Sequence, residues 1–144
     1  MIYRQAHKTD GEALASVQKS QPRCAQWEMA GWQGELDAPG ARIWCAQEQA
    51  HVVGFVALRF VAGVGEITNV AVLPQWCGRG VGSRLLEQTL EWVRQQGGGK
   101  ITLEVGVNNT SACKLYEKAG FVALGLRKHF YQTGEDALIM GIEI

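Results

Sequence analysis

The sequence passes from strand to helix in the stretch Val72-Leu-Pro-Gln-Trp-Cys-Gly-Arg-Gly-Val-Gly-Ser-Arg-Leu-Leu86. An apolar run over residues 67–73 precedes Pro74, and a helical pattern of apolar side chains follows the glycines. Glycine lets the backbone turn tightly and lets a ligand approach without meeting a Cβ. The first N–H groups of a helix lack partners within the helix and carry partial positive charge. The stretch favours a phosphate-binding loop, although a glycine-rich surface turn that binds nothing would show the same pattern.

Two other phosphate-binding loops fit this stretch poorly. A Walker A loop ends in Gly-Lys-Ser/Thr, whereas Gly82 is followed by Ser83-Arg84. A dinucleotide-binding fingerprint needs a third glycine where Leu85 stands. Glu104 occupies about the place of the ribose-binding acid of that fingerprint, but too little sequence follows for a six-stranded Rossmann sheet. The Rossmann interpretation is therefore weak.

Composition indicates one globular domain over residues 1–144, since 47% of the residues are hydrophobic and the chain can bury a proper core. Fourteen basic and fourteen acidic residues cancel, so the charge gives no sign of a nucleic acid or an anionic membrane as partner. No signal peptide or membrane-spanning run is visible. The four cysteines are scattered, without Cys-x-x-Cys or histidines at ligand spacing, which argues against a metal site and a disulfide framework. We expect a cytoplasmic protein with reduced thiols and no metal.

Hydrophobic periodicity and turn residues predict a mixed sheet with helices on both faces, antiparallel in its N-terminal part and with one βαβ crossover. A capping box at Thr9-Asp-Gly-Glu12 opens the first predicted helix, and the second covers about residues 25–36. The third begins after the glycines and ends near Gln96, and Asn109 caps the fourth. The predicted strands cover residues 2–6, 42–48, 52–61, 66–73, 100–105, 121–126 and 137–142.

Two motifs in the predicted crossover resemble those of the GCN5-related N-acetyltransferases. Cys77-Gly-Arg-Gly-Val-Gly82 is similar to the acetyl-CoA loop of that family, Gln/Arg-x-x-Gly-x-Gly/Ala. Asn109-Thr-Ser-Ala-Cys-Lys-Leu-Tyr-Glu-Lys-Ala-Gly-Phe121 is similar to its Asn-x-x-Ala-x-x-Leu-Tyr-x-x-x-Gly-Phe segment. The resemblance covers essentially the whole chain and implies the α/β (α+β) fold of the family, with a sheet of about six to seven strands. Cys77 departs from the usual Gln or Arg, and Gly106 stands where related enzymes often carry Arg.

The tail of the chain resembles the branch of the family that acetylates ribosomal proteins on an N-terminal alanine. The resemblance is carried by Ile67-Thr-Asn-Val-Ala-Val72, Leu103-Glu-Val105, Arg127-Lys-His-Phe-Tyr131 and Gly134-Glu-Asp-Ala-Leu-Ile-Met140. It implies transfer of acetyl from acetyl-CoA to a protein α-amine in a ternary complex, by a monomer or weak dimer. A small-molecule amine or a lysine side chain remains an alternative acceptor. A non-catalytic CoA-sensing domain is a further alternative, which would need neither Glu104 nor Tyr116.

Glu104 is the candidate general base. It lies on a strand whose other face is Ile101, Leu103 and Val105, in a region where both faces of a sheet are usually covered, so an unpaired carboxylate should face a cleft or a partner. A glutamate on a half-exposed strand would look the same. The resemblance makes Tyr116 the candidate general acid toward the CoA thiolate, although its apolar neighbours also suit a core tyrosine.

The resemblance also implies a cofactor site and an acceptor site. In the family, backbone groups of a strand pair with the pantetheine amides as an added strand would. Amides of the glycine-rich loop bind the pyrophosphate, and an asparagine contacts the pantetheine arm. The cofactor-binding residues are Val70, Ala71, Val72, Gly78, Arg79, Gly80, Val81, Gly82, Ser83 and Asn109. The acceptor is expected against Trp27, Glu28 and Tyr131, where an acidic segment over residues 24–41 would attract a basic peptide. A core-packed helix with a solvated acidic face is the alternative for that segment.

Overall fold

The computed structural model describes residues 1–144 as a seven-stranded sheet with four α-helices and two short 3₁₀ turns, η1 and η2. In chain order the elements are β1 (Ile2–Gln5), η1 (Lys8–Asp10), α1 (Gly11–Lys19), α2 (Met29–Asp37), β2 (Ala41–Glu48), β3 (His51–Val61), β4 (Val64–Val72), η2 (Pro74–Trp76), α3 (Val81–Gln95), β5 (Lys100–Gly106), α4 (Thr110–Lys118), β6 (Val122–Arg127) and β7 (Ala137–Glu143). None of the helices is both long and apolar enough to cross a bilayer.

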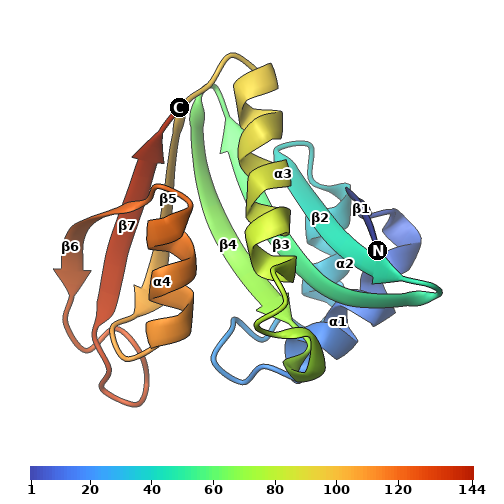
Figure 1. Ribbon diagram of the computed structural model, residues 1–144, viewed down its shortest axis with the longest axis horizontal. Coiled ribbons are helices and arrows are strands. Elements are labelled where there is room, and N and C mark those ends of the chain that lie inside the picture. The colour runs from blue at the N-terminus through green and yellow to red at the C-terminus, as the bar shows by residue number, and fades with distance from the viewer.

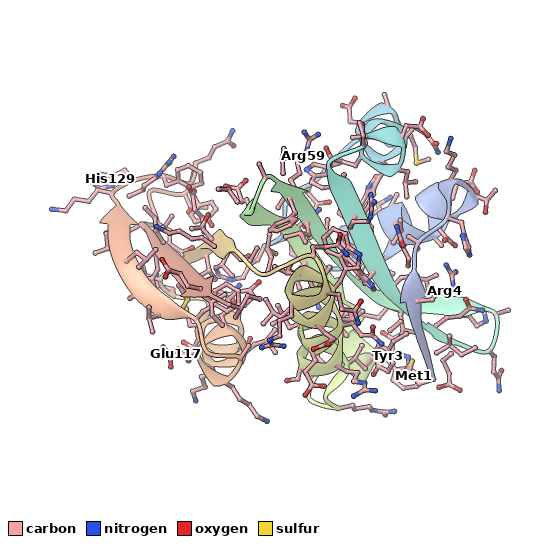
Figure 2. The ribbon with its side chains drawn as sticks, turned by 90° about the horizontal axis from the view of Figure 1, so that it is seen from above. Met1, Tyr3, Arg4, Arg59, Glu117 and His129 are labelled. Carbon is pink, nitrogen blue, oxygen red and sulfur yellow. The ribbon has the colours of Figure 1, made fainter.

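The strands lie in the order β1-β2-β3-β4-β5-β7-β6. Only β4 and β5 pair in parallel, and α3 makes the crossover between them; every other neighbouring pair is antiparallel. The predicted mixed sheet with one βαβ crossover is therefore confirmed. The strands β1 and β6 form opposite edges of the sheet, and Figure 2 shows Tyr3 and His129 at these two sides of the molecule.

Two hydrophobic clusters lie on the two faces of the sheet. The larger one packs α3 and α4 against the sheet, and the smaller one packs α1 and α2 against it. In Figure 2 α3 and α4, the latter carrying Glu117, lie on the side opposite to α1 and α2. The apolar stripe predicted for α3 is buried: Val81, Leu85, Leu90 and Val93 are each at most 3% exposed. The prediction of helices on both faces is confirmed.

Two local predictions were wrong. The capping box predicted at Thr9 and Glu12 is not formed: Asp10 is the N-cap of α1, without a side-chain capping hydrogen bond, and its carboxylate accepts the His7 N–H (2.6 Å) at the start of η1. The Arg4 guanidinium holds the Asp10 carboxylate by donating two hydrogen bonds to it, of 2.8 and 2.9 Å. The second helix begins only at Met29, so the start predicted near residue 25 lies in a loop.

The sheet splits between β4 and β5. The two strands pair only from Val64 to Glu66 with Lys100 to Thr102, and Figure 1 shows them meeting at one end and diverging toward the other. The pairing of β4 with β3 shifts register at Thr68, because Ala57 pairs with Asn69 and Leu58 with Ile67. Such a bulge increases the local twist of a strand. Beyond it β4 continues through Val72 without a partner on its β5 side.

Candidate functional site

A single large cleft, about 1600 Å³ in volume, opens where the sheet splits. Its walls come from β4, the glycine-rich loop and the start of α3 on one side, and from β5 and α4 on the other. Two loops, at residues 21–27 and 130–133, line it as well. Figure 1 shows all of these segments at the end where β4 and β5 diverge.

The glycine-rich loop presents unpaired amides to the cleft. Gly78 and Gly80 have φ values of +76° and +83°, a conformation that disfavours any side chain, and nothing lies within 4 Å of where their Cβ atoms would be. The helical hydrogen bonds begin with Arg84 N–H to the Gly80 carbonyl (3.0 Å), so the amides of residues 81–83 precede the ladder. The loop and helix start can therefore hold an anion.

The free edge of β4 forms the adjacent wall. Val70, Ala71 and Val72 line the cleft, and among strands only β3, on the opposite edge, pairs with this stretch. The Val72 carbonyl accepts a hydrogen bond from Nε2 of Gln21 at 2.7 Å. Backbone donors and acceptors on an unpaired strand edge can bind an extended ligand as an added strand. The edge leads directly to the glycine-rich loop, so an extended amide-containing arm and a phosphate can be bound by consecutive segments.

Glu104 lies on β5 and points into the cleft, while Ile101, Leu103 and Val105 are buried on the opposite face as predicted. Its side chain is 21% exposed, and its Oε1 lies 3.3 Å from Nε of Arg127 on β6. The carboxylate is therefore paired with a guanidinium, partly shielded and accessible from the cleft. These are the properties that a general base for an ammonium group needs.

Tyr116 lines the same cleft from α4, although it is only 7% exposed. Its ring packs edge to face on Phe121, with centroids 5.9 Å apart. Burial is the main cause that raises the pKa of the Tyr116 phenol well above its ordinary value. The phenol therefore stays protonated at neutral pH and can donate a proton into the cleft. Both proposed roles of this residue, core packing and cleft lining, coexist.

The structure brings most of the predicted site residues together. Besides the two catalytic candidates, the cleft is lined by Val70, Ala71, Val72, Gly78, Gly80, Val81, Gly82, Ser83, Asn109, Trp27 and Tyr131. Arg79 lies outside it, with its guanidinium over the ring of Trp76 at 4.9 Å. Asn109 stands at the N-cap of α4, but its side chain makes no capping hydrogen bond.

The acidic segment is placed differently from the prediction. Glu28 is exposed at the start of α2 and does not line the cleft. Glu35 forms an ion pair with Arg59, and Asp37 forms one with Lys8 at 3.3 Å. Arg59 and Lys8 are distant from this segment in the sequence. The segment itself contains no basic partner for its carboxylates, so the ion pairs cannot be seen in its sequence. The acidic residues of this segment therefore do not form a charged wall of the cleft.

Sequence reasoning missed a pair of buried amide side chains, Gln18 and Asn69, that hold the loop at residues 21–27. Gln18, 4% exposed, donates to the Trp27 carbonyl (2.8 Å) and accepts from the Trp27 N–H (2.9 Å). Asn69, also 4% exposed, donates to the Ala25 carbonyl (3.1 Å) and to Gln18 Oε1 (3.3 Å). The two side chains fix residues 25–27 against β4. A lone Gln in a helix and a lone Asn in a strand carry no spacing signal that joins them.

Comparisons with known proteins agree with this geometry. The family model described as "Acetyltransferase (GNAT) family" matches residues 6–121. A candidate [ribosomal protein bS18]-alanine N-acetyltransferase of Bacillus subtilis is 34% identical over 110 residues, which cover 76% of this chain and 73% of that protein. The N-alpha-acetyltransferase RimI of Mycobacterium tuberculosis is 33% identical over 119 residues, covering 79% and 73%.

Among solved structures, the ribosomal-protein-S18-alanine N-acetyltransferase from Escherichia coli superposes with a TM-score of 0.89 at 24% identity, over 99% of this chain and 93% of that one. This likeness concerns the fold. The family match spans the split sheet, the glycine-rich loop and the α4 segment that form the cleft. The chain therefore belongs to the acetyltransferase (GNAT) family.

Proposed function

We propose that this acetyltransferase moves acetyl from acetyl-CoA to the N-terminal α-amine of a protein, with alanine of a ribosomal protein as the acceptor. The observation that carries the proposal is the placement of Glu104 on β5 and Tyr116 on α4 in one cleft, across from the free edge of β4. The named relatives from Bacillus subtilis and Mycobacterium tuberculosis support the choice of acceptor.

Two parts of the cleft suit two parts of one acetyl-CoA molecule. The unpaired edge at residues 70–72 offers backbone groups for the pantetheine amides, and the open amides from Gly78 to Ser83 suit the pyrophosphate. Gly82 keeps the start of α3 close to α4, because a Cβ at position 82 would stand 3.2 Å from the Leu115 side chain of α4. A larger residue would therefore push the two walls apart.

In the proposed reaction the Glu104 carboxylate, directly or through water, takes a proton from the acceptor ammonium. The freed amine forms a bond to the thioester carbonyl carbon, and a β4 N–H donates to the oxygen that becomes negative. The carbon–sulfur bond then breaks. Tyr116 gives its proton to the leaving thiolate, and the second proton of the amine nitrogen passes through water to the Tyr116 phenolate as the amide forms. The products are the N-acetylated chain and CoA with its thiol, and Glu104 returns its proton to the solvent.

An α-amine suits this site better than a lysine side chain. The α-amino group has an ordinary pKa near 8, whereas a lysine amine has one near 10.4. A single, largely shielded carboxylate next to Arg127 is therefore a sufficient base for an α-amine at neutral pH. Deprotonating a lysine would require roughly 3 kcal/mol more, at 1.36 kcal/mol for each pKa unit.

Mass spectrometry of acetyl transfer tests the proposal. The acceptors are basic peptides that begin with Ala, Ser or Met, and one α-blocked peptide with free lysines. We expect a single acetyl group on the free Ala terminus and none on the α-blocked peptide. Acetylation of lysines at a comparable rate would refute the acceptor assignment.

Glu104→Gln is the matched variant, because it keeps the shape of the side chain and removes the base. We expect kcat/KM at pH 7 to fall by about 10²-fold or more, with acetyl-CoA binding unchanged. The deficit should shrink above pH 8, where the α-amine is already neutral. A deficit that stays the same at pH 7 and pH 9 would contradict the role of Glu104 as base.

A further inference from the structure

We propose that an ion pair between Arg23 and Glu135 ties together the two loops at the acceptor end of the cleft, and that both act as positioning residues for the acceptor peptide. Arg23 belongs to the loop between α1 and α2, and Glu135 to the loop between β6 and β7. This inference rests on the proposed function, because it concerns how the acceptor of that reaction is held.

The ion pair joins distant parts of the chain at the mouth of the cleft. Nη1 of Arg23 lies 3.2 Å from Oε1 of Glu135, across 112 residues of sequence. Both loops line the cleft, one through residues 21–27 and the other through residues 130–133. Figure 1 shows the two loops at the end where β4 and β5 diverge. The pair therefore connects opposite walls where no strand pairing does so.

Glu135 is held as one end of this tie. Its side chain is 13% exposed, and Oε2 accepts the Asn108 N–H at 2.8 Å. Its backbone carbonyl accepts the Tyr131 N–H at 3.2 Å. The carboxylate is thus held by the turn that follows β5, and the backbone of Glu135 by its own loop, while Arg23 supplies the half-exposed partner.

Gly106 provides the space for this carboxylate. A Cβ at position 106 would stand 2.5 Å from Oε2 of Glu135, closer than real Cβ contacts come. The end of the Glu135 side chain would have to move, and with it the contacts to Asn108 and Arg23. The glycine at position 106 therefore leaves the carboxylate room to hold both partners.

The electrostatic surroundings place the pair beside the reacting groups. Tyr131 lines the cleft, and its phenol has a raised pKa, mainly through burial and then through Glu104 and Glu135, while Arg23 lowers it. The charges of Glu104, Glu135 and Arg23 thus all influence the pKa of the same phenol, that of Tyr131. Glu104 and the two tied loops line the same cleft, so a peptide bound at Glu104 lies close to both loops.

Four variants test the tie: Arg23→Gln, Glu135→Gln, the double variant and Arg23→Lys. Glu135→Gln keeps an oxygen for the Asn108 N–H and loses only the charge. We expect each single Gln variant to raise the KM for an Ala peptide by about threefold to tenfold, as for a partly exposed ion pair. The Kd for acetyl-CoA should not change, Arg23→Lys should restore most of the loss, and the double variant should be no worse than either single one.

Two results would overturn the proposal. Additive losses in the double variant would mean that each residue contacts the peptide separately, and an unchanged KM in both single variants would mean that the tie has no effect. Raising the salt concentration is an internal check, because it should weaken wild-type acceptor binding toward that of the variants.

Hydrogen–deuterium exchange separates this inference from the proposed function, since it needs no acceptor. If the wild-type protein acetylates no N-terminal peptide, the proposed function fails while the tie can still be measured. Exchange in segments 21–27 and 131–136 should rise equally in both single variants and no further in the double variant. Unchanged exchange in these segments would refute the tie.

Discussion

Glu104 and Tyr116 face the same cleft with opposite electrostatic environments. Glu104 is partly solvated, and its Oε1 lies 3.3 Å from Nε of Arg127. Tyr116 is buried among apolar side chains, and this burial raises the pKa of its phenol. One cleft thus holds a solvated, paired carboxylate beside a phenol that keeps its proton, as an acid–base pair needs.

Replacing Tyr116 with Phe removes the proton donor and keeps the ring packed on Phe121. We expect kcat to fall by about 10²-fold, the lower end for general acids, because a thiolate is a fairly stable leaving group. The KM values and the melting temperature should stay close to those of the wild type. Steady-state kinetics with both substrates measure this effect.

The pH dependence gives the same prediction a second test. The pKa of the Tyr116 phenol is raised above its ordinary value of about 10, so the group keeps its proton throughout an assay up to pH 9.5. Loss of this proton therefore causes no fall in wild-type kcat within that range. An alkaline fall that disappears in the Phe variant would show that the phenol titrates earlier.

At the scale of elements, the glycine-rich loop depends on backbone conformation. Gly80 adopts φ = +83° immediately before α3, and its position makes the following amides available to the cleft. A residue with a Cβ costs roughly 1–2 kcal/mol in this conformation. The loop could relieve that strain by turning its amides away from the bound anion.

We expect Gly80→Ala to raise the Kd for acetyl-CoA by about fivefold to tenfold, through the strain in the loop. Isothermal titration calorimetry measures this change. Gly34→Ala is the matched control, because Gly34 lies in α2 with nothing within 4 Å of its Cβ position. That variant should bind acetyl-CoA normally and gain about 0.4–1 kcal/mol of stability. Equal affinity in the two variants would refute the loop assignment.

At the scale of the molecule, one sheet separates two cores that support different walls of the cleft. Leu85 of α3 belongs to the core beneath the glycine-rich loop, and Leu14 of α1 to the core beneath the loop at residues 21–27. Both side chains are 0% exposed. The two buried clusters have no buried residue in common and lie on opposite faces of the sheet. Substitutions in the two clusters should therefore change the free energy of unfolding independently.

We expect Leu85→Ala and Leu14→Ala each to lower the free energy of unfolding by about 2–5 kcal/mol, through lost burial and the remaining cavity. In the double variant the two losses should add within about 0.5 kcal/mol. Urea denaturation measures all three variants. Leu124→Ala, at a 53% exposed position on β6, is the control and should change stability by less than about 0.5 kcal/mol. A strongly non-additive double variant would show that the two cores are coupled through the sheet.

The predictions from the sequence succeeded where the signal was local. The apolar stripe of α3, the alternation of Ile101, Leu103 and Val105, and the glycines before α3 each show a regular pattern over a few residues. The start of α2 was misplaced, because the Trp27 backbone is held outside the helix by Gln18. The acidic segment was misread, because its partner Arg59 comes from another strand.

The sequence by itself determined the order of the elements, the mixed sheet and the glycine-rich turn before α3. The candidates Glu104 and Tyr116 came from the family resemblance, and the structure places both in one cleft. Periodicity, glycine conformation and helix-end chemistry act between neighbouring residues, so they can be read along the chain. Only the tertiary structure decided that β4 and β5 part after three paired residues, that Arg127 accompanies Glu104, and that Arg23 meets Glu135. These features depend on side chains brought together from distant strands and loops, and no local pattern specifies such distances.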